Sequence, residues 1–565
     1  MRSIWAGVLG LAALVVGCSP GVTAPSAGPS SEPAPTVQRT LAMAIAVEPG
    51  SLSLRPPRET FANSDHTRIF NADFAIADDH ATPIPYLVEA LPQLNSDTWQ
   101  VLPDGRMQTT YRLQPNLTWQ DGTPLTASDF QFGFRVYSSP GVGLSLQPPF
   151  VAMESVDTPD ARTVVIHWKR TYPDAGHMTG RDRNFPALPR HLLEAAFSGE
   201  SVESFLSHPY WSREFLGLGP YRVADWEPGS FIAAAAFDGH VWGRPKIDRL
   251  HIAFISDSNT ALANLLSSQL DFAGGLLRIA NAVTLRQEWE ARQGGTVFYQ
   301  VANWHGVVVQ FLPGRTSPSS LLDPRVRKAL AHAIDRSALN DAIYAGLALE
   351  ADYQLPPNGQ WGDEVKRGAV KYAYDLALAE RLMREAGFQR ATDGGYSSPG
   401  EGPLSVELMS GGSDAPELAA LSNGWEKAGF KISQRVVPPA QAVDPEIKLG
   451  YPGLQITTQL ATERTVVAPV PGNIPTPENG WRGGSQIAWT NAEYTRLVDE
   501  FASTLDRARR SEQVVGMARV FSDNVAAISL HFPPRVVSAA ARLTGPHEVP
   551  PEANVFWNVH QWELH

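Results

Sequence analysis

WQDGTPLTASDFQFGFRVY, residues 119–137, contains the signals of a turn followed by a helix. Asp121-Gly122 is a dipeptide typical of tight turns. Thr126, followed three residues later by Asp129, is typical of a helix N-terminus, where an acidic side chain meets the positive end of the helix dipole. Aromatic side chains then recur at helical spacing, at Phe130, Phe134 and Tyr137. The stretch predicts a turn and an amphipathic helix, and the alternating residues before it, MQTTYRL at 107–113, predict a half-buried strand.

Further helix signals occur downstream. Asp323-Pro324 combines an N-cap residue with a proline at the first helical position. Asp375 is typical of another N-cap, with Gly387 as the stop of that helix. Thr490 and Glu493 match a T-x-x-E capping box. Apolar stretches between these signals predict strands at 163–168, 249–255, 296–301, 306–311 and 404–408. Because helices and strands mix along the whole chain, we expect an α/β architecture with more than one sheet.

Length and charge limit the possible classes of function. A chain of 565 residues is too long for one hydrophobic core and predicts about two to four domains. Its 58 acidic residues outnumber its 46 basic residues, which gives a formal net charge of −12. Since affinity for nucleic acid comes mainly from clustered positive charge, we expect no nucleic-acid partner.

The N-terminus has the layout of a secretory signal. The positive Met1-Arg2 precedes an apolar run, residues 4–16, which is too short for a stable membrane span of about 20 residues. Cys18 follows and is the single cysteine of the chain, so it has no partner for an intrachain disulfide. The local sequence VVGC resembles a bacterial lipobox, which implies a signal peptide over residues 1–17 and a lipid on Cys18. Residues 18–36 are rich in Pro, Gly, Ser, Ala and Thr and predict a flexible tether.

Motifs of common enzymes are missing from the sequence. It contains no G-x-S-x-G, no H-E-x-x-H and no G-x-x-x-x-G-K-[ST]. Asp78-Asp79-His80 is a tight group of acidic and imidazole side chains, but its polar surroundings, followed by prolines, are typical of a solvated turn. We therefore expect no catalytic residue, no metal site and no cofactor, and predict that the protein is not an enzyme.

Several blocks of the sequence resemble one family, in the order that this family has. WQDGTPLTASDF is similar to its signature W-x-D-G-x-P-x-T-A-x-D, and LGPYRVADWEPG to its G-x-G-P-Y block. The other blocks are FDGHVWGRPKIDRLHIAFI (237–255), LANLLSSQLDFAG (262–274), DPRVRKALAHAIDR (323–336), YDLALAERLMREAGF (374–388) and NAEYTRLVDEF (491–501). On these residues the chain resembles the bacterial extracellular solute-binding proteins of the oligopeptide and dipeptide class, family 5, which are receptors of ABC importers.

The resemblance implies an α/β fold of the periplasmic-binding-protein type II-like class, with two lobes around a ligand cleft and an additional inserted subdomain. Lobe I would comprise residues 37–80, 205–305 and 525–565. The inserted subdomain would cover residues 81–204, and lobe II residues 306–524. The hinge would lie near Asn303-Trp304 and near the start of the C-terminal segment.

The ligand class stays open at this point. Peptide-binding members of the family share a W-x-x-D-Y-x-D-P stretch, whose first acidic residue pairs with the free amino group of the peptide. The corresponding residues 451–470 lack that aspartate; Gln459 lies near its place, and Glu463 is the closest carboxylate downstream. Because a buried ammonium without a carboxylate partner is costly, the ligand could be a peptide, an oligosaccharide, an opine or another small solute.

The resemblance also indicates which residues line the cleft. Flat aromatic faces can stack on sugar rings or peptide side chains, and an arginine can bind a carboxylate. The remaining candidates for ligand contacts are Asn71, Trp304, Trp481, Arg482, Gln486 and Trp489.

The function that the resemblance implies is that of an extracytoplasmic lipoprotein, anchored to the cell membrane through Cys18. It would capture a peptide or peptide-like solute and deliver it to the permease subunits of an ABC importer. We expect a monomer. Binding of another small solute, or a role as a signal receptor or chaperone on the same fold, is the alternative.

Overall fold

The turn and helix predicted at residues 119–137 are present in the computed structural model, which describes residues 38–55, 65–179, 183–411, 415–438, 441, 444–481 and 483–565. Helix α1 (Ala127–Tyr137) begins with a capping box in which the backbone N–H of Thr126 donates to the Asp129 carboxylate at 2.8 Å. Strand β5 (Met107–Arg112) alternates between buried and more exposed residues. Both local predictions are confirmed.

Two of the three N-caps predicted downstream of α1 are confirmed. Asp323 caps α6 (Pro324–His332), and Asp375 caps α9 (Leu376–Glu385) by accepting a hydrogen bond from Leu378 N at 2.8 Å. The capping box at Thr490 and Glu493 was a wrong prediction. Asn491 is the N-cap of α13 (Ala492–Phe501), because its carboxamide oxygen accepts from Tyr494 N at 3.0 Å. Asparagine is at least as good an N-cap as threonine, so the helix starts one residue later.

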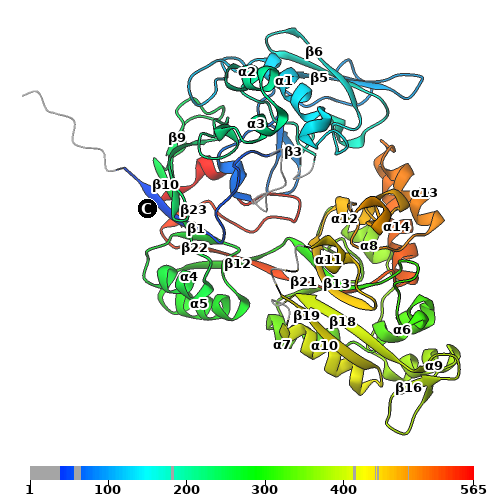
Figure 1. Ribbon diagram of the computed structural model, residues 1–565. Coiled ribbons are helices and arrows are strands. Elements are labelled where there is room, and N and C mark those ends of the chain that lie inside the picture. The colour runs from blue at the N-terminus through cyan, green and yellow to red at the C-terminus, as the bar shows by residue number, and fades with distance from the viewer. Residues whose placement is uncertain are drawn as a thin grey trace, which may run out of the picture. The chain divides into compact units, whose positions relative to one another are not determined.

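The first large sheet has seven strands within the described residues (Figure 1). Its order is β12 (Gly295–Val301), β22 (Pro534–Ala540), β11 (Phe272–Gly274), β1 (Thr40–Ile45), β10 (Arg249–Phe254), β9 (Phe231–Ala236) and β8 (Tyr221–Glu227). Helices α4 (Ser258–Leu266) and α5 (Ile279–Arg292) bury apolar side chains together with residues of β1, β11 and β22. We call this sheet with its helices lobe I.

The second large sheet has six strands in the described chain and forms lobe II. Its order is β14 (Leu349–Glu350), β21 (Ala527–Phe532), β13 (Asn303–Val309), β20 (Leu454–Leu460), β18 (Ser405–Gly411) and β19 (Lys431–Val437). Alternate residues of β13 enter two separate apolar clusters, Val307 one and Trp304 the other. Helices therefore cover both faces: α6, α7 (Arg336–Tyr344), α9 and α10 (Ala415–Lys427) contribute to the first cluster, and α8 (Gly362–Gly368), α13 and α14 (Arg507–Asp523) to the second.

A third, smaller unit is inserted between strands of lobe I. Its sheet has the order β4 (Trp99–Val101), β5, β7 (Thr163–Trp168) and β6 (Met153–Asp160). Helices α1, α2 (Arg190–Gly199) and α3 (Val202–Leu206) accompany it, and its apolar side chains belong to the same cluster as residues of β1, β10 and β22. The insertion thus shares a continuous core with lobe I.

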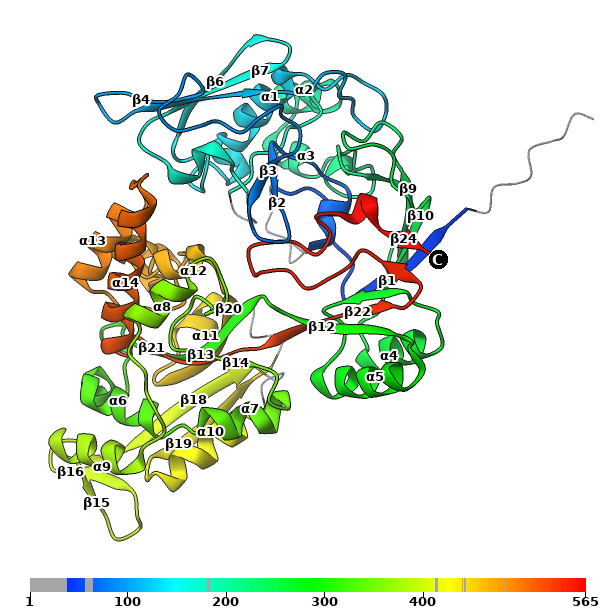
Figure 2. The same ribbon diagram turned by 180° about the vertical axis from the view of Figure 1, so that it is seen from behind.

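The two large sheets are joined by two adjacent crossings of the described chain (Figures 1 and 2). One runs from β12 to β13 through Ala302, and the other from β21 to β22 through Pro533. On the lobe I side Val301 pairs with Pro534, and on the lobe II side β13 pairs with β21. The second crossing follows β21, which belongs to the lobe II sheet. These observations establish a mixed α/β fold with two lobes.

No helix of the described residues has both the length and the apolar character needed to cross a membrane. The remaining short elements are strands β2 (Ala75–Ala77), β3 (Pro83–Pro85), β15 (Gln389–Arg390), β16 (Tyr396–Ser398), β17 (Gly402–Pro403), β23 (Leu543–Thr544) and β24 (Glu563–Leu564), and helices α11 (Pro445–Leu449) and α12 (Glu463–Val467).

The environment of Trp304 generates a stability prediction. Its side chain is fully buried beside the crossing from β12 to β13, and its indole N–H donates to Ser529 Oγ at 3.1 Å. Trp304→Ala should lower the free energy of unfolding by about 3–5 kcal/mol, since it removes a large buried side chain. Trp481→Ala is the matched control, because Trp481 is only half-buried and packs under Arg315, so its loss should cost about 1 kcal/mol or less. Urea denaturation measures both; equal stability of the two variants would contradict the prediction.

Candidate binding cavity between the lobes

A cavity of about 430 Å³ lies where lobe I, lobe II and the insertion meet. Lobe I contributes residues of the segment 65–68, residues at the two crossings (Gln300, Val301, Ala302 and Arg535) and the C-terminal segment 550–554. The insertion contributes Pro173, Asp174, His177, Thr179, Arg183 and Asn184. The lobe II residues are Leu355, Gln360, Trp361, Leu460, Thr462, Glu463, Arg464, Leu505, Arg507 and Arg510. Ligand pockets in proteins commonly measure about 300–1,000 Å³, so this cavity suits a small solute.

Glu463, at the first position of α12, is held by four donors. Its Oε1 accepts from the Trp361 indole N–H at 2.6 Å and from Gln360 Nε2 at 3.1 Å. Its Oε2 accepts from Arg183 Nη2 at 2.5 Å and from Arg510 Nη2 at 3.1 Å. Burial alone would raise the pKa of Glu463, but the two arginines and the indole hydrogen bond outweigh it and lower this pKa to about 2. Glu463 is therefore ionised and fully engaged within the protein.

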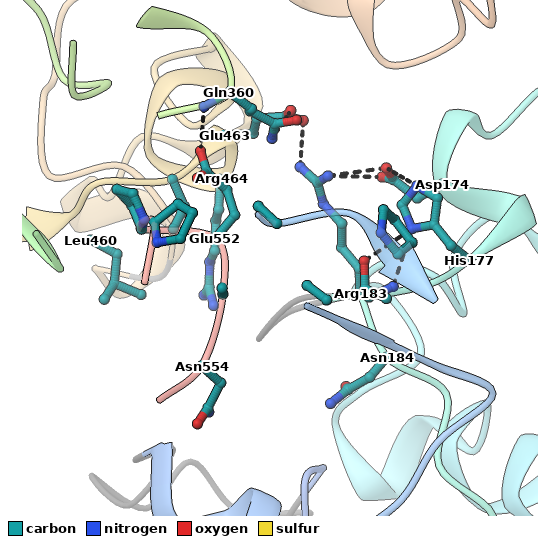
Figure 3. A pocket seen from close by; sticks show the side chains of 18 of the residues that line it. Asp174, His177, Arg183, Asn184, Gln360, Leu460, Glu463, Arg464, Glu552 and Asn554 are labelled. Atoms are coloured by element: carbon teal, nitrogen blue, oxygen red, sulfur yellow. Dashed lines mark hydrogen bonds and ion pairs between the residues drawn. The ribbon is translucent and has the colours of Figure 1, made fainter. Parts of the chain in front are cut away.

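Arg183 connects the insertion to lobe II (Figure 3). Its guanidinium lies between Glu463 and Asp174, with an N–O distance of 3.1 Å to the Asp174 carboxylate. Although burial opposes the charged form, these two carboxylates raise the pKa of Arg183 above its ordinary value. Burial lowers the pKa of the neighbouring His177. The ion pair from Arg183 to Glu463 is thus a direct contact across the cavity.

Two more hydrogen bonds cross between the parts that surround the cavity. The backbone N–H of Gln360, in lobe II, donates to Glu552 Oε1 at 2.9 Å, and the Thr171 hydroxyl donates to the carbonyl of Ser503 at 2.6 Å. Glu552 Oε2 is buried and has no hydrogen-bond partner among the described residues. Burial accordingly raises the pKa of Glu552. Glu552 therefore has a carboxylate oxygen that can accept a hydrogen bond from a ligand, whereas both oxygens of Glu463 are already engaged.

Basic side chains dominate the cavity wall. Among its described residues, six are arginine and four are aspartate or glutamate. Three of the carboxylates are in ion pairs within the wall: Glu463, Asp174 with Arg183, and Asp65 with Arg535. Arg507 stacks on Trp361, with its guanidinium carbon 3.4 Å from the ring centroid. The wall is locally more basic than the chain as a whole, which is acidic.

Of the residues expected from the sequence to contact a ligand, Glu463 lines the cavity. Trp304 and Trp489 lie in the lobe II core, where Trp489 packs edge-on against Tyr494 and Phe521. The other described candidates lie outside the cavity wall. Asn71 donates hydrogen bonds to the carbonyls of Leu52 and Thr67, and Gln486 accepts one from the Thr457 hydroxyl. Gln459 is half-buried on β20, and Trp481 packs under Arg315. Cys18 and Arg482 lie outside the described residues.

The cavity residues that sequence reasoning missed include Arg183, Trp361, Arg510 and Glu552. They come from four separate segments, none of which has a motif, and only the folded chain brings them together.

Asp78-Asp79-His80 forms the turn between β2 and β3. Asp78 Oδ1 accepts from Thr82 N at 2.8 Å and from His80 N at 2.9 Å, and Asp79 lies 2.8 Å from the His80 ring. The ligand atoms of the three residues lie within 4.8 Å of one another, and His80 is exposed. These hydrogen bonds explain the group as a self-capped turn.

Comparisons with known proteins give the family. The family model "Bacterial extracellular solute-binding proteins, family 5 Middle" matches residues 89–461. A Brucella ovis protein, named as an ABC transporter peptide-binding protein, is 26% identical over 341 residues, which are 60% of this chain; the chain spans only 59% of that relative. Protein XP55 of Streptomyces lividans is 27% identical over 426 residues, 74% of this chain and 71% of XP55.

Solved structures share the fold at low sequence identity. NikA from Brucella suis, in complex with Fe(III)-EDTA, is 16% identical with a TM-score of 0.75, covering 93% of this chain and 100% of NikA. The Thermus thermophilus oligopeptide-binding protein, in complex with a pentapeptide, is 18% identical with a TM-score of 0.73, covering 93% and 96%. The chain therefore belongs to the bacterial extracellular solute-binding proteins, family 5, and has their two-lobe, type II periplasmic binding fold.

Proposed function

We propose that the protein is the extracytoplasmic substrate-binding component of an ABC importer, which captures a small solute between its lobes and delivers it to membrane permease subunits. The observation that carries this proposal is the polar cavity between two lobes joined by two adjacent strand crossings. Relatives of the family named for peptide binding, and a neighbour holding a pentapeptide, support a peptide or peptide-like solute. We further propose that the protein acts as a monomer without catalysis, held at the membrane by a lipid on Cys18.

Closure of the lobes would proceed by rotation about the two crossings. A ligand shifts such an equilibrium only by its preference for the closed form. A micromolar ligand supplies about −8 kcal/mol, which exceeds the few kcal/mol that usually separate the two forms. The contacts from Arg183 to Glu463 and from Gln360 to Glu552 would belong to the closed form, because they join opposite walls of the cavity.

The geometry also bears on the choice between peptides and other solutes. The aspartate that pairs with a peptide's amino group in other family members is missing here, and Glu463 cannot replace it without losing bonds to its four donors. A free peptide ammonium would have to use Glu552 instead. This observation favours the alternative that the solute is an oligosaccharide, an opine or another small solute rather than a peptide with a free amino terminus.

A thermal-shift screen tests the proposed function. A solute at 100 times its Kd should add about 2.7 kcal/mol to the free energy of unfolding and raise Tm by several degrees. The panel should contain free peptides, N-acetylated peptides, sugars and opines. Ala553→Trp is the control, since Ala553 lines the cavity and a large side chain there would fill it. Loss of every shift in this variant, with an unchanged Tm of the free protein, would place the solute in the cavity. A panel without any hit would contradict the proposal.

A second prediction concerns the ion pair across the cavity. Glu463→Gln should lower the free energy of unfolding at pH 7 by about 3 kcal/mol, because it leaves buried arginines without their carboxylate. Since the pKa of Glu463 is lowered from 4.5 to about 2 by folding, its contribution is complete above pH 4.5 and is lost as the pH falls toward 2.

The difference in stability between the wild type and Glu463→Gln should therefore shrink between pH 4.5 and pH 2, as measured by urea denaturation. The exposed Glu288→Gln is the control and should differ little from the wild type at any pH. A difference for Glu463→Gln that stays constant down to pH 2 would refute the prediction.

A further inference from the structure

One arginine of the cavity wall is buried without a hydrogen-bond or ion-pair partner among the described residues. Arg68 lies on the 3₁₀ helix Asp65–Ile69, lines the cavity and is 8% exposed. Its guanidinium has no hydrogen bond or ion pair with any other residue in the described parts of the chain, and its Nη1 is shielded from solvent. Arg183 and Arg510, in contrast, both reach the Glu463 carboxylate.

The carboxylates closest to Arg68 are already engaged. Asp73 is 1% exposed and accepts hydrogen bonds from the backbone N–H groups of Phe74 at 2.8 Å and Phe185 at 3.1 Å. Burial raises the pKa of Asp73 to about 6 against the opposing charge of Arg68, so the two groups attract each other, but no hydrogen bond joins them among the described residues. Asp65 is ion-paired with Arg535. The described residues therefore supply no hydrogen-bonded counter-ion for the Arg68 guanidinium, and Asp73 acts on it only through longer-range attraction.

A buried charge without a partner is costly to a fold. Burial lowers the pKa of Arg68, because the charged guanidinium is less stable away from water. Replacing such a group by an apolar one of similar size is commonly neutral or stabilising. Charged groups of this kind are retained where function requires them, because an incoming ligand can complete the interaction.

On the basis of the proposed function, we propose that Arg68 binds a carboxylate of the solute and that the cavity selects solutes that carry one. A planar guanidinium matches a carboxylate in two parallel hydrogen bonds. Arginine residues outnumber acidic residues in the cavity wall, which likewise favours a negatively charged solute. The Glu463 carboxylate is already bound by arginine, which disfavours a cationic solute beside it. Arg68 is thus a specificity residue that the sequence motifs of the chain did not indicate.

The test compares acids with their uncharged counterparts on the full chain. N-acetyl-dialanine and its amide form one pair, and gluconate and glucose another, each followed by thermal shift and by calorimetric titration at constant ionic strength. We expect binding of at least one acid and about ten- to hundredfold weaker binding of that acid to Arg68→Met. Arg68→Lys keeps the charge but loses the planar pair of donors, so its affinity for the acid should lie between those of the wild type and Arg68→Met.

Two controls separate this role from a structural one. Free Arg68→Met should have a Tm equal to or above that of the wild type, because the substitution removes a buried charge that has no hydrogen-bond partner among the described residues. Arg222→Met, an exposed arginine of β8, should bind the acid as the wild type does.

Equal binding of an acid and its uncharged counterpart, unchanged acid binding in Arg68→Met, or a large drop in the Tm of that free variant would overturn the proposal for Arg68. Each of these results leaves the proposed function intact. Absence of binding by every solute of both this set and the wider screen would instead contradict the proposed function itself.

Discussion

The structure depends on two short crossings of the chain that lie side by side, at Ala302 and Pro533. On the lobe I side of these crossings β12 pairs with β22, and on the lobe II side β13 pairs with β21. Each lobe has its own hydrogen-bonded sheet, so the proposed rotation would change only a few backbone angles between the sheets. Pro533 and the residue after it, Pro534, have no backbone N–H, so bending there loses no hydrogen bond donated by either residue. Hinges commonly consist of a few residues at the ends of elements, as here.

The cavity is built directly on this hinge. Gln300, Val301 and Ala302 from one crossing and Arg535 from the other are part of its wall. A solute in the cavity would therefore contact both lobes and the segments about which we propose that they rotate. This arrangement would couple occupancy to closure without any element that spans a long distance.

Local structure was readable from the sequence, whereas the site was not. The capping residues of α1, α6 and α9 act on neighbours within four positions, so their signals survive in a single stretch of sequence. Trp304 and Trp361 have no such local signal. Trp304 lies in the core and Trp361 lines the cavity, and this difference arises only from how the folded chain packs. The family blocks describe turns, caps and packing faces, which explains why they predicted two lobes and an insertion without predicting the cavity residues.

The measurement that tests the account most directly is the distance between the lobes with and without solute. Spin labels at two exposed positions, Gln287 on α5 and Arg381 on α9, report this distance by pulsed electron paramagnetic resonance. The single native cysteine, Cys18, is replaced by serine so that it takes no label. We expect saturating solute to change the distance distribution and to narrow it to one population. An identical distribution with and without a bound solute would contradict capture by closure of the lobes.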